Sequence, residues 1–122
     1  MARRFTRQEV LRRLRQTVTE EKPIIGAGAG AGIIAKFCER GGIDLVILYA
    51  TGRSRLMGIG THIIGDPNTV VLELAHEILF VVKDTPVIAG IQPTDPTREM
   101  DKLLQQYKDL GFSGIINFPS TA

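Results

Sequence analysis

The sequence predicts an α/β protein in which a leading helix is followed by βαβαβαβ, with the four strands in one parallel sheet. Short apolar runs alternate with longer segments whose apolar residues recur at helical spacing, which indicates successive βα units. The run at residues 44–49 is apolar almost throughout, as is typical of a parallel strand covered on both faces. With 122 residues and a hydrophobic fraction of 43%, the chain is long enough for one core, so we expect a single domain over residues 1–122.

The first helix is predicted to begin after Phe5. Thr6 can cap its N-terminus, Glu9 completes a capping box three residues later, and Phe5 is placed to pack on Val10. The helix should end near Lys22, because a proline follows it. An apolar stripe at helical spacing should dock this helix on the rest of the protein, and it consists of Val10, Leu11, Leu14 and Val18.

Two βα units are predicted in the first half of the chain. A short strand at residues 24–27 leads into a glycine-rich turn, and a helix over 33–40 follows. The apolar residues of that helix are Ile33, Ile34 and Phe37, and its single cysteine, Cys38, is expected to be a small buried hydrophobe. The second strand covers 44–49, and a loop is predicted from residue 50 to residue 67.

The second half repeats the pattern. Asp66 is a candidate N-cap for a helix that starts at Pro67 and carries apolar residues to position 79. The third strand is predicted at residues 86–91. After a turn, Asp95 is the candidate N-cap and Pro96 the first residue of a helix that ends at Gly111. The fourth strand covers 113–118.

The glycine-rich run at residues 26–32 is the most informative local feature. Glycine allows a backbone to approach a ligand closely, and a turn that opens a helix presents free N–H groups and a positive dipole end. One interpretation is therefore an anion pocket that uses Gly26, Gly28 and Gly30. The other is tight packing between strand and helix that needs only small residues, and the run alone does not decide between them.

Ligands of parallel α/β folds bind at the C-terminal ends of the strands. After the second strand, Arg53 and Arg55 could clamp an anion, because a guanidinium group suits carboxylate and phosphate. Solvated loop arginines are the alternative. Polar residues also follow the third and fourth strands, so that one rim of the sheet collects them: Gln92, Thr94, Asp95, Asn117 and Ser120.

Several common kinds of site are not supported. Residues 26–31 satisfy the dinucleotide-binding pattern, but no acidic residue ends the second strand, which reads Tyr49-Ala50-Thr51. No Gly-Lys-Ser/Thr follows the glycines, which excludes a P-loop. His62 and His76 do not form a ligand-spaced pair, so no metal ligand is assigned.

Charge and hydropathy indicate which classes of binding partner to expect. The net charge is only +2, and the arginines of the first helix are not accompanied by stacking aromatic residues, so we expect a solvated helix face and no nucleic-acid partner. No apolar run approaches membrane-spanning length and no signal sequence is visible, so we expect a cytoplasmic protein without a membrane partner.

Motifs along nearly the whole chain resemble the phosphoenolpyruvate hydrolase-like family, also described as TIM-barrel signal transduction proteins. They are Gly26-Ala-Gly-Ala-Gly30, Ala35-Lys36, Gly41-Gly42-Ile43-Asp44, Leu48-Tyr49-Ala50-Thr51-Gly52-Arg53, Arg55, Thr94-Asp95-Pro96, Met100-Asp101, Gly111-Phe112-Ser113-Gly114 and Asn117-Phe118-Pro119. The resemblance implies a (β/α)₈ barrel related to the phosphoenolpyruvate mutase and isocitrate lyase superfamily. It also implies these site residues: Gly26, Gly28, Gly30, Tyr49, Thr51, Gly52, Arg53 and Arg55.

Such a barrel takes about 250 residues, so four strands correspond to its first half. A half-barrel exposes sheet edges and one apolar face. Three expectations stay open: closure by pairing with copies of itself, which would make the protein a homo-oligomer; a small open sheet; or a truncated or engineered piece of a longer barrel.

The resemblance also bears on catalysis. Acidic residues that organise magnesium in the mutase-like enzymes lie at the end of strand three and beyond, where this chain reads Ala89-Gly90-Ile91 and has Asn117 near the end of strand four. A magnesium site is therefore poorly supported, and we expect no cofactor. If the protein is an enzyme, its activity should be hydrolase- or lyase-like, but the set of catalytic residues is incomplete. We expect a half-barrel module that binds a small phosphorylated or carboxylate ligand at the strand ends. The alternative is a non-catalytic, self-associating structural or signalling module.

Overall fold

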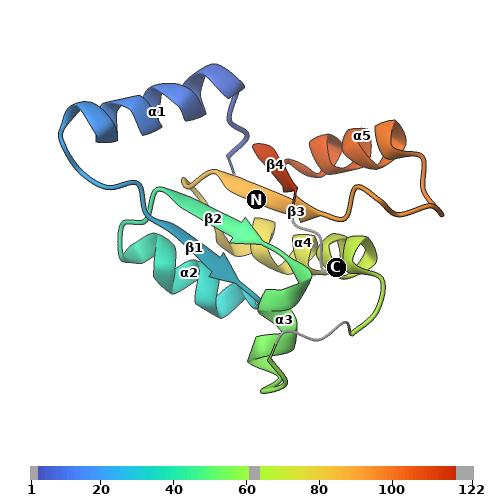
Figure 1. The fold of residues 1–122 in the computed structure, drawn as a ribbon. Coiled ribbons are helices and arrows are strands. Elements are labelled where there is room, and N and C mark those ends of the chain that lie inside the picture. Colours follow the sequence, from blue (N-terminus) through green and yellow to red (C-terminus); the bar gives the residue numbers. More distant parts are fainter. Residues whose placement is uncertain (1–2, 61–63, 118–122) are drawn as a thin grey trace.

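The computed structural model describes residues 3–60 and 64–117. Its helices and strands alternate as the sequence predicts, with one additional helix after the second strand (Figure 1). In chain order the elements are α1 (Arg7–Thr19), β1 (Gly26–Ala29), α2 (Gly32–Arg40), β2 (Leu45–Leu48), α3 (Ala50–Leu56), α4 (Pro67–Val81), β3 (Val87–Ile91), α5 (Met100–Leu110) and β4 (Gly114–Asn117).

The four strands form one parallel sheet in the order β1-β2-β3-β4, so spatial order equals chain order. Each strand is joined to the next by at least one helix, as parallel pairing requires. A consecutive parallel sheet of βα units is the arrangement of half a (β/α)₈ barrel, and the predicted fold class is confirmed.

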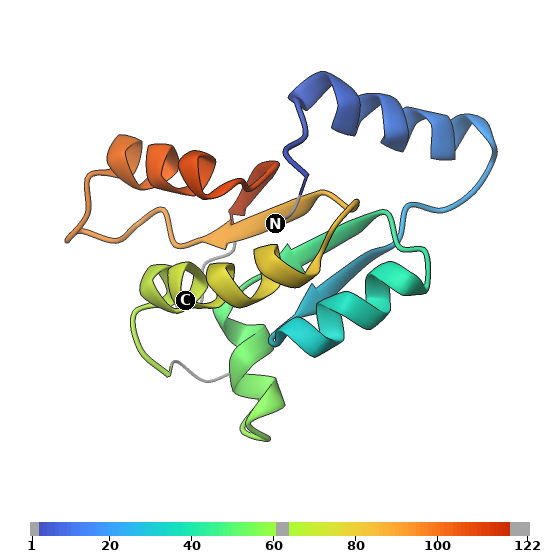
Figure 2. The same cartoon turned by 180° about the vertical axis from the view of Figure 1, so that it is seen from behind.

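The core lies between the sheet and the helices that follow the strands. Figures 1 and 2 show α2 and α4 side by side against one face of the sheet, with α5 beside β3 and β4. Val46, Leu48 and Ala89 are fully buried on this face, and Ile78 of α4 packs in the same cluster. Tyr107 of α5 closes the core, with its ring edge-on to that of Phe112 at 5.5 Å between centroids.

The opposite face of the sheet carries the alternate residues of each strand. Register places Gly28, Ile47, Ile88 and Gly114 in one row across all four strands, and Ile116 follows on β4. None of these belongs to the buried core, and Ile116 is 38% exposed. We call the apolar surface formed by Leu45, Ile47, Ile88 and Ile116 the inner face, because it corresponds to the interior of a barrel.

The helix α1 lies beyond the N-terminal ends of the strands, set apart from the sheet (Figure 1). Its capping box is confirmed, since Thr6 accepts from the Glu9 amide and the Glu9 carboxylate accepts from the Thr6 amide. The apolar stripe docks only in part: Val10 is buried, whereas Val18 is 60% exposed. Within the part of the chain that the structure describes, no helix is long and apolar enough to cross a membrane.

The first strand lies two residues later than predicted. Ile24 and Ile25 precede β1, which begins at Gly26, and both side chains are exposed. The cause is Asp44, whose carboxylate accepts the Ile25 amide at 2.8 Å and whose own amide donates to the Ile25 carbonyl oxygen. This exchange ties Ile25 to the segment before β2, so the ladder starts with the glycines, which lie in the strand and not only in a turn.

The predicted loop over residues 50–67 is wrong in its first part, because α3 starts directly after β2. The Ser54 side chain is fully buried, and its hydroxyl lies within hydrogen-bond distance of the carbonyl oxygens of Thr51 and Gly60. These contacts fix α3 to the segment that follows it. A hydroxyl that bonds main-chain carbonyl oxygens has no periodic signature, so the pattern did not reveal this helix.

Two further predictions are corrected. Asp95 does not cap α5, which starts at Met100; its carboxylate accepts from the Thr97 amide and hydroxyl and forms a local turn instead. On α2, Ile33 and Phe37 are 63% and 56% exposed, and Cys38 is only partly buried. The predicted cap at Asp66 is confirmed, since its side chain accepts from two amides of the first turn of α4.

Candidate functional site

An open pocket of about 330 Å³ lies at the C-terminal ends of β1 and β2, where the sequence predicts a site. It brings together five of the eight predicted residues with two apolar neighbours. The lining residues are Gly28, Gly30, Ile34, Tyr49, Gly52, Arg55 and Leu56. We call this the rim pocket.

The phenol of Tyr49 lies directly over Gly28. A Cβ atom at position 28 would stand 2.5 Å from the Tyr49 hydroxyl oxygen, so any side chain there would displace the ring. At position 30 a Cβ would overlap the carbonyl group of Gly52 in α3. Tight packing therefore accounts for glycine at position 30, while glycine at position 28 makes room for the ring that lines the pocket.

The other three predicted residues do not line the rim pocket. Gly26 is exposed at the start of β1, and Thr51 is buried in α3. The guanidinium of Arg53 donates to the Gly30 carbonyl oxygen at 3.2 Å, which braces the turn after β1 against α3. Of the two predicted clamp arginines, only Arg55 lines the pocket.

The N-terminus of α2 is met by a carboxylate of the protein itself. The amide of Gly32 donates to Oε1 of Glu77, on α4, at 2.5 Å, and the N-cap residue Ala31 offers no side-chain hydrogen bond. Glu77 thus supplies both the missing cap and the negative charge that a helix N-terminus attracts. Sequence reasoning missed this contact, because 45 residues separate the two partners and no local pattern connects them.

A second polar group lies beyond the C-terminal end of β3, around the fully buried Asn68. Its Nδ2 donates to the Gln92 carbonyl oxygen at 3.1 Å and to the Asp95 carboxylate at 3.2 Å, and its Oδ1 accepts from the Gln92 amide at 2.9 Å. Gln92 and Asp95 were predicted rim residues, whereas Asn68 was missed. The Asp66-Pro67 pair predicted the start of a helix, but it did not indicate that the side chain of the following residue, Asn68, is buried.

Arg98 joins this group by bridging two carboxylates. Its Nη2 lies 2.7 Å from Asp66, and its Nε lies 3.3 Å from Asp95. Burial raises the pKa of Asp66, but hydrogen bonds from Thr69 and Arg98 outweigh it and leave that pKa below the usual aspartate value. Hydrogen bonds from Thr97 likewise lower the pKa of Asp95. We call Asp66, Asp95 and Arg98 the rim brace, because the three hold α4 to the segment before α5.

The neighbouring Tyr107 is kept neutral. Burial raises its pKa to about 12, and its hydroxyl donates to the Asn68 carbonyl oxygen at 3.4 Å. Its role is therefore to pack beneath the Asn68 group, and it presents no ionisable group to a ligand near neutral pH.

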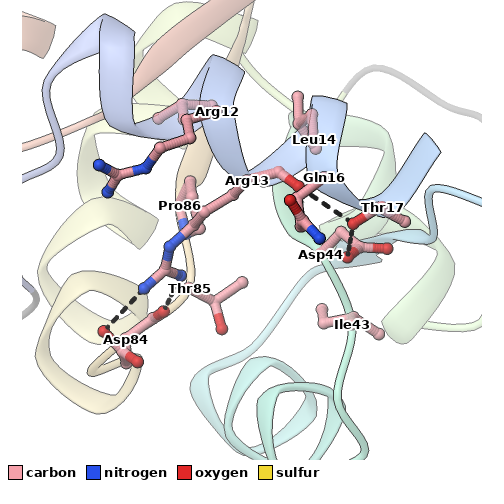
Figure 3. A pocket seen from close by; sticks show the side chains of 11 residues that line it. Arg12, Arg13, Leu14, Gln16, Thr17, Ile43, Asp44, Asp84, Thr85 and Pro86 are labelled. Atoms are coloured by element: carbon pink, nitrogen blue, oxygen red, sulfur yellow. Dashed lines mark hydrogen bonds and ion pairs between the residues drawn. The ribbon is translucent and has the colours of Figure 1, made fainter. Parts of the chain in front are cut away.

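A larger cavity, of about 450 Å³, lies at the opposite end of the sheet, between α1 and the N-terminal ends of β2 and β3 (Figure 3). Arg13 crosses it to the Asp84 carbonyl oxygen at 2.8 Å and to the Asp84 carboxylate at 3.3 Å, while Thr17 lies 3.4 Å from Asp44 (Figure 3). By volume alone, this cavity would be preferred to the rim pocket as a ligand site. The N-terminal face of such folds serves stability and the C-terminal face carries ligands, so the rim pocket is the candidate site.

Acidic side chains near the strand ends are engaged with other groups of the protein. Among residues 3–60 and 64–117, no three His, Cys, Asp or Glu side chains are grouped so that they could hold a metal ion. The carboxylates of Asp66 and Asp95, beyond the end of β3, are both paired with Arg98. The predicted rim residue Ser120 and the discounted His62 lie outside the described residues.

Curated proteins with similar sequences are much longer than this chain. The ToMV resistance protein Tm-1(GCR237) of Solanum lycopersicum is 48% identical over 93% of the chain, and the ToMV susceptible protein tm-1(GCR26) of the same plant is 49% identical over 91%. The putative transcriptional regulatory protein y4pA of Sinorhizobium fredii is 33% identical over 94%. The chain spans only 16%, 15% and 20% of their respective lengths.

The fold also matches a solved structure. A phosphonopyruvate hydrolase, determined in complex with oxalate and Mg²⁺, superposes with a TM-score of 0.66 at 20% identity, covering 91% of this chain and 38% of that one. This similarity shows the fold. The family model described as phosphoenolpyruvate hydrolase-like matches residues 9–122, which span every strand and nearly all of the leading helix. With its motifs, its strand order and this match in agreement, the chain belongs to the phosphoenolpyruvate hydrolase-like family.

Proposed function

We propose that this protein binds a small carboxylate or phosphorylated anion in the rim pocket. The observation that carries the proposal is the convergence of Arg55, the Tyr49 phenol and the glycine backbone at Gly28 and Gly30 on one opening at the strand ends. In parallel α/β folds this end of the sheet is where ligands bind.

The chemistry of the lining suits such a ligand. A guanidinium group pairs with a carboxylate or a phosphate through two parallel hydrogen bonds, and a phenol hydroxyl donates one more. The remaining walls, Ile34 and Leu56, are apolar, so they favour a ligand with a short carbon skeleton over a free inorganic ion.

Oxalate and phosphonopyruvate are the natural probes. The solved structure that shares this fold is named as a phosphonopyruvate hydrolase in complex with oxalate and Mg²⁺. Both probes are small, and each carries a carboxylate. Each probe is therefore titrated both without and with added Mg²⁺.

The proposal is one of binding, and no catalytic step is derived. Among the described residues, none that lines the rim pocket is Asp, Glu, His or Cys, so this part of the lining supplies no carboxylate, imidazole or thiol to a reaction.

The test is a titration of the isotope-labelled protein with oxalate and with phosphonopyruvate, followed by two-dimensional NMR. Arg55→Gln should weaken binding by about tenfold or more, since a charge-assisted contact is lost. Arg15→Gln is the matched control, because it removes the same charge from α1, at the far end of the sheet. Equal affinity of the two variants, or shifts confined to residues around Arg13 and Asp84, would rule out the rim pocket.

A further inference from the structure

We propose that α1 is a hinged strap that opens as a unit while the sheet stays folded, and that Asp84 holds it shut. The strap lies over the cavity at the N-terminal ends of β2 and β3 (Figure 3). The proposal rests on contacts among the described residues and is independent of ligand binding at the rim pocket. Three features support it: the ion pairs at Asp84, the shallow docking of α1, and the segment that joins α1 to β1.

The first feature joins the start of the strap to the turn between α4 and β3. One guanidinium nitrogen of Arg3 and one of Arg13 lie 3.2 and 3.3 Å from the same carboxylate oxygen of Asp84. Arg13 also donates to the Asp84 carbonyl oxygen at 2.8 Å. Both guanidinium groups lie over the ring of Phe5, at 4.8 and 4.6 Å from its centroid. We call Arg3, Arg13 and Asp84 the latch, because one carboxylate pairs with both cations.

Water and salt weaken the forces that hold the latch. The Asp84 side chain is 68% exposed, and those of Arg3 and Arg13 are 48% and 38% exposed. Exposed ion pairs contribute little each to stability, and dissolved salt screens them. The free energy that holds α1 in place should therefore depend on ionic strength, whereas the packing of the core should not.

The second feature is that few apolar contacts dock α1. Of its residues only Val10 is buried, and none belongs to the core cluster of the described chain. The cavity of about 450 Å³ lies beneath the helix and is lined by Leu14 and Thr17 among others. Toward the C-terminal end of α1, the Thr17 hydroxyl lies 3.4 Å from the Asp44 carboxylate, a long distance for a hydrogen bond. Opening of α1 therefore leaves the core cluster intact.

The third feature is the segment that joins α1 to β1, which has the form of a hinge. Residues 20–25 are all exposed, and Glu21 has φ 57°, the one positive φ at a residue other than glycine in the described chain. At the end of the segment, Ile25 is fixed to Asp44 by hydrogen bonds through its amide and its carbonyl oxygen. Rotation about residues 21–24 can therefore move α1 while β1 stays anchored.

The test is amide hydrogen exchange of the unaltered chain, followed residue by residue by NMR. A helix of 13 residues is only marginally stable by itself in water, so α1 should lose its helical hydrogen bonds when it opens. We expect the amides of α1 to exchange at least about tenfold faster than those of α4 and β3. Exchange in α1 should accelerate further between about 0.05 and about 0.5 M salt, while α4 and β3 keep their protection.

A pair of variants isolates the latch. Asp84→Asn removes its negative charge and keeps the main-chain carbonyl group that Arg13 contacts. Exchange in α1 should rise about fivefold, as expected for the loss of two exposed ion pairs, and should depend less on salt. Asp101→Asn is the matched control, because it removes the same charge in the first turn of α5. Exchange of α1 only together with the core, exchange in α1 that does not respond to salt, or equal exchange in the two variants would each overturn the proposal.

Discussion

The turn after β1 is held both by a hydrogen bond from Arg53 and by close packing of its backbone. Arg53 donates to the Gly30 carbonyl oxygen, while the Gly30 backbone lies against the Gly52 carbonyl group. The turn after β1 and the first residues of α3 are therefore in direct contact, and Gly30 and Gly52 both line the rim pocket. Only a residue without a side chain fits at position 30, whereas position 52 has room for a methyl group.

This difference leads to a paired prediction. Gly30→Ala should lower the free energy of unfolding by about 1–3 kcal/mol, because the added methyl group meets backbone atoms that have no room to move. Gly52→Ala should leave stability unchanged or raise it slightly, since the new atom makes an ordinary contact at 3.4 Å and alanine favours the helix. Urea denaturation of both variants measures the difference, and equal effects would contradict this account of the turn.

Single elements are positioned here by contacts between segments that are distant in sequence. The rim brace links the N-terminus of α4 to the segment before α5 through Arg98, and Glu77 of α4 caps α2. Both contacts involve a carboxylate on or next to α4, so this helix organises the rim as well as the core. Its N-cap residue, Asp66, is a carboxylate whose pKa is lowered in the folded state.

The rim brace makes stability depend on pH in the acid range. The pKa of Asp66 and that of Asp95 are both lowered in the folded state, so their contribution is fully present above the ordinary aspartate pKa of 3.8 and is lost as pH falls through the lowered values. Asp66→Asn keeps a good N-cap but removes the charge, and it should cost about 1 kcal/mol at neutral pH. The free energy of unfolding of this variant should also fall less steeply with decreasing pH than that of the unaltered protein.

Thermal unfolding followed between neutral pH and pH 3 tests this expectation. Asp101→Asn, on the exposed side of α5, is the matched control and should retain the full acid dependence. If both variants show the same pH profile as the unaltered protein, the rim brace does not contribute through its charge.

At the scale of the whole molecule, the described chain is an incomplete closed architecture. Its outer layer of helices covers one face of the sheet, and the inner face and both edges present surfaces that a barrel normally buries.

The alternation of strands and helices, the capping box at Thr6 and the cap at Asp66 could all be predicted from sequence, because each depends on residues only a few positions apart. Five of the eight candidate residues do meet at one pocket. Their positions follow from the rule that parallel strands all end at one rim. Whether they bind an anion stays a prediction.

The remaining features arise only when distant segments meet. Hydrogen bonds between Asp44 and Ile25 precede β1, which starts at the glycines. The Glu77 carboxylate accepts from the first amide of α2, and Arg53 donates to the Gly30 carbonyl oxygen. Local periodicity and propensity determine which segments become helices and strands, since those preferences act between near neighbours. The partner of each polar group, by contrast, depends on which groups the folded chain brings within about 3 Å of one another, and only tertiary packing decides that.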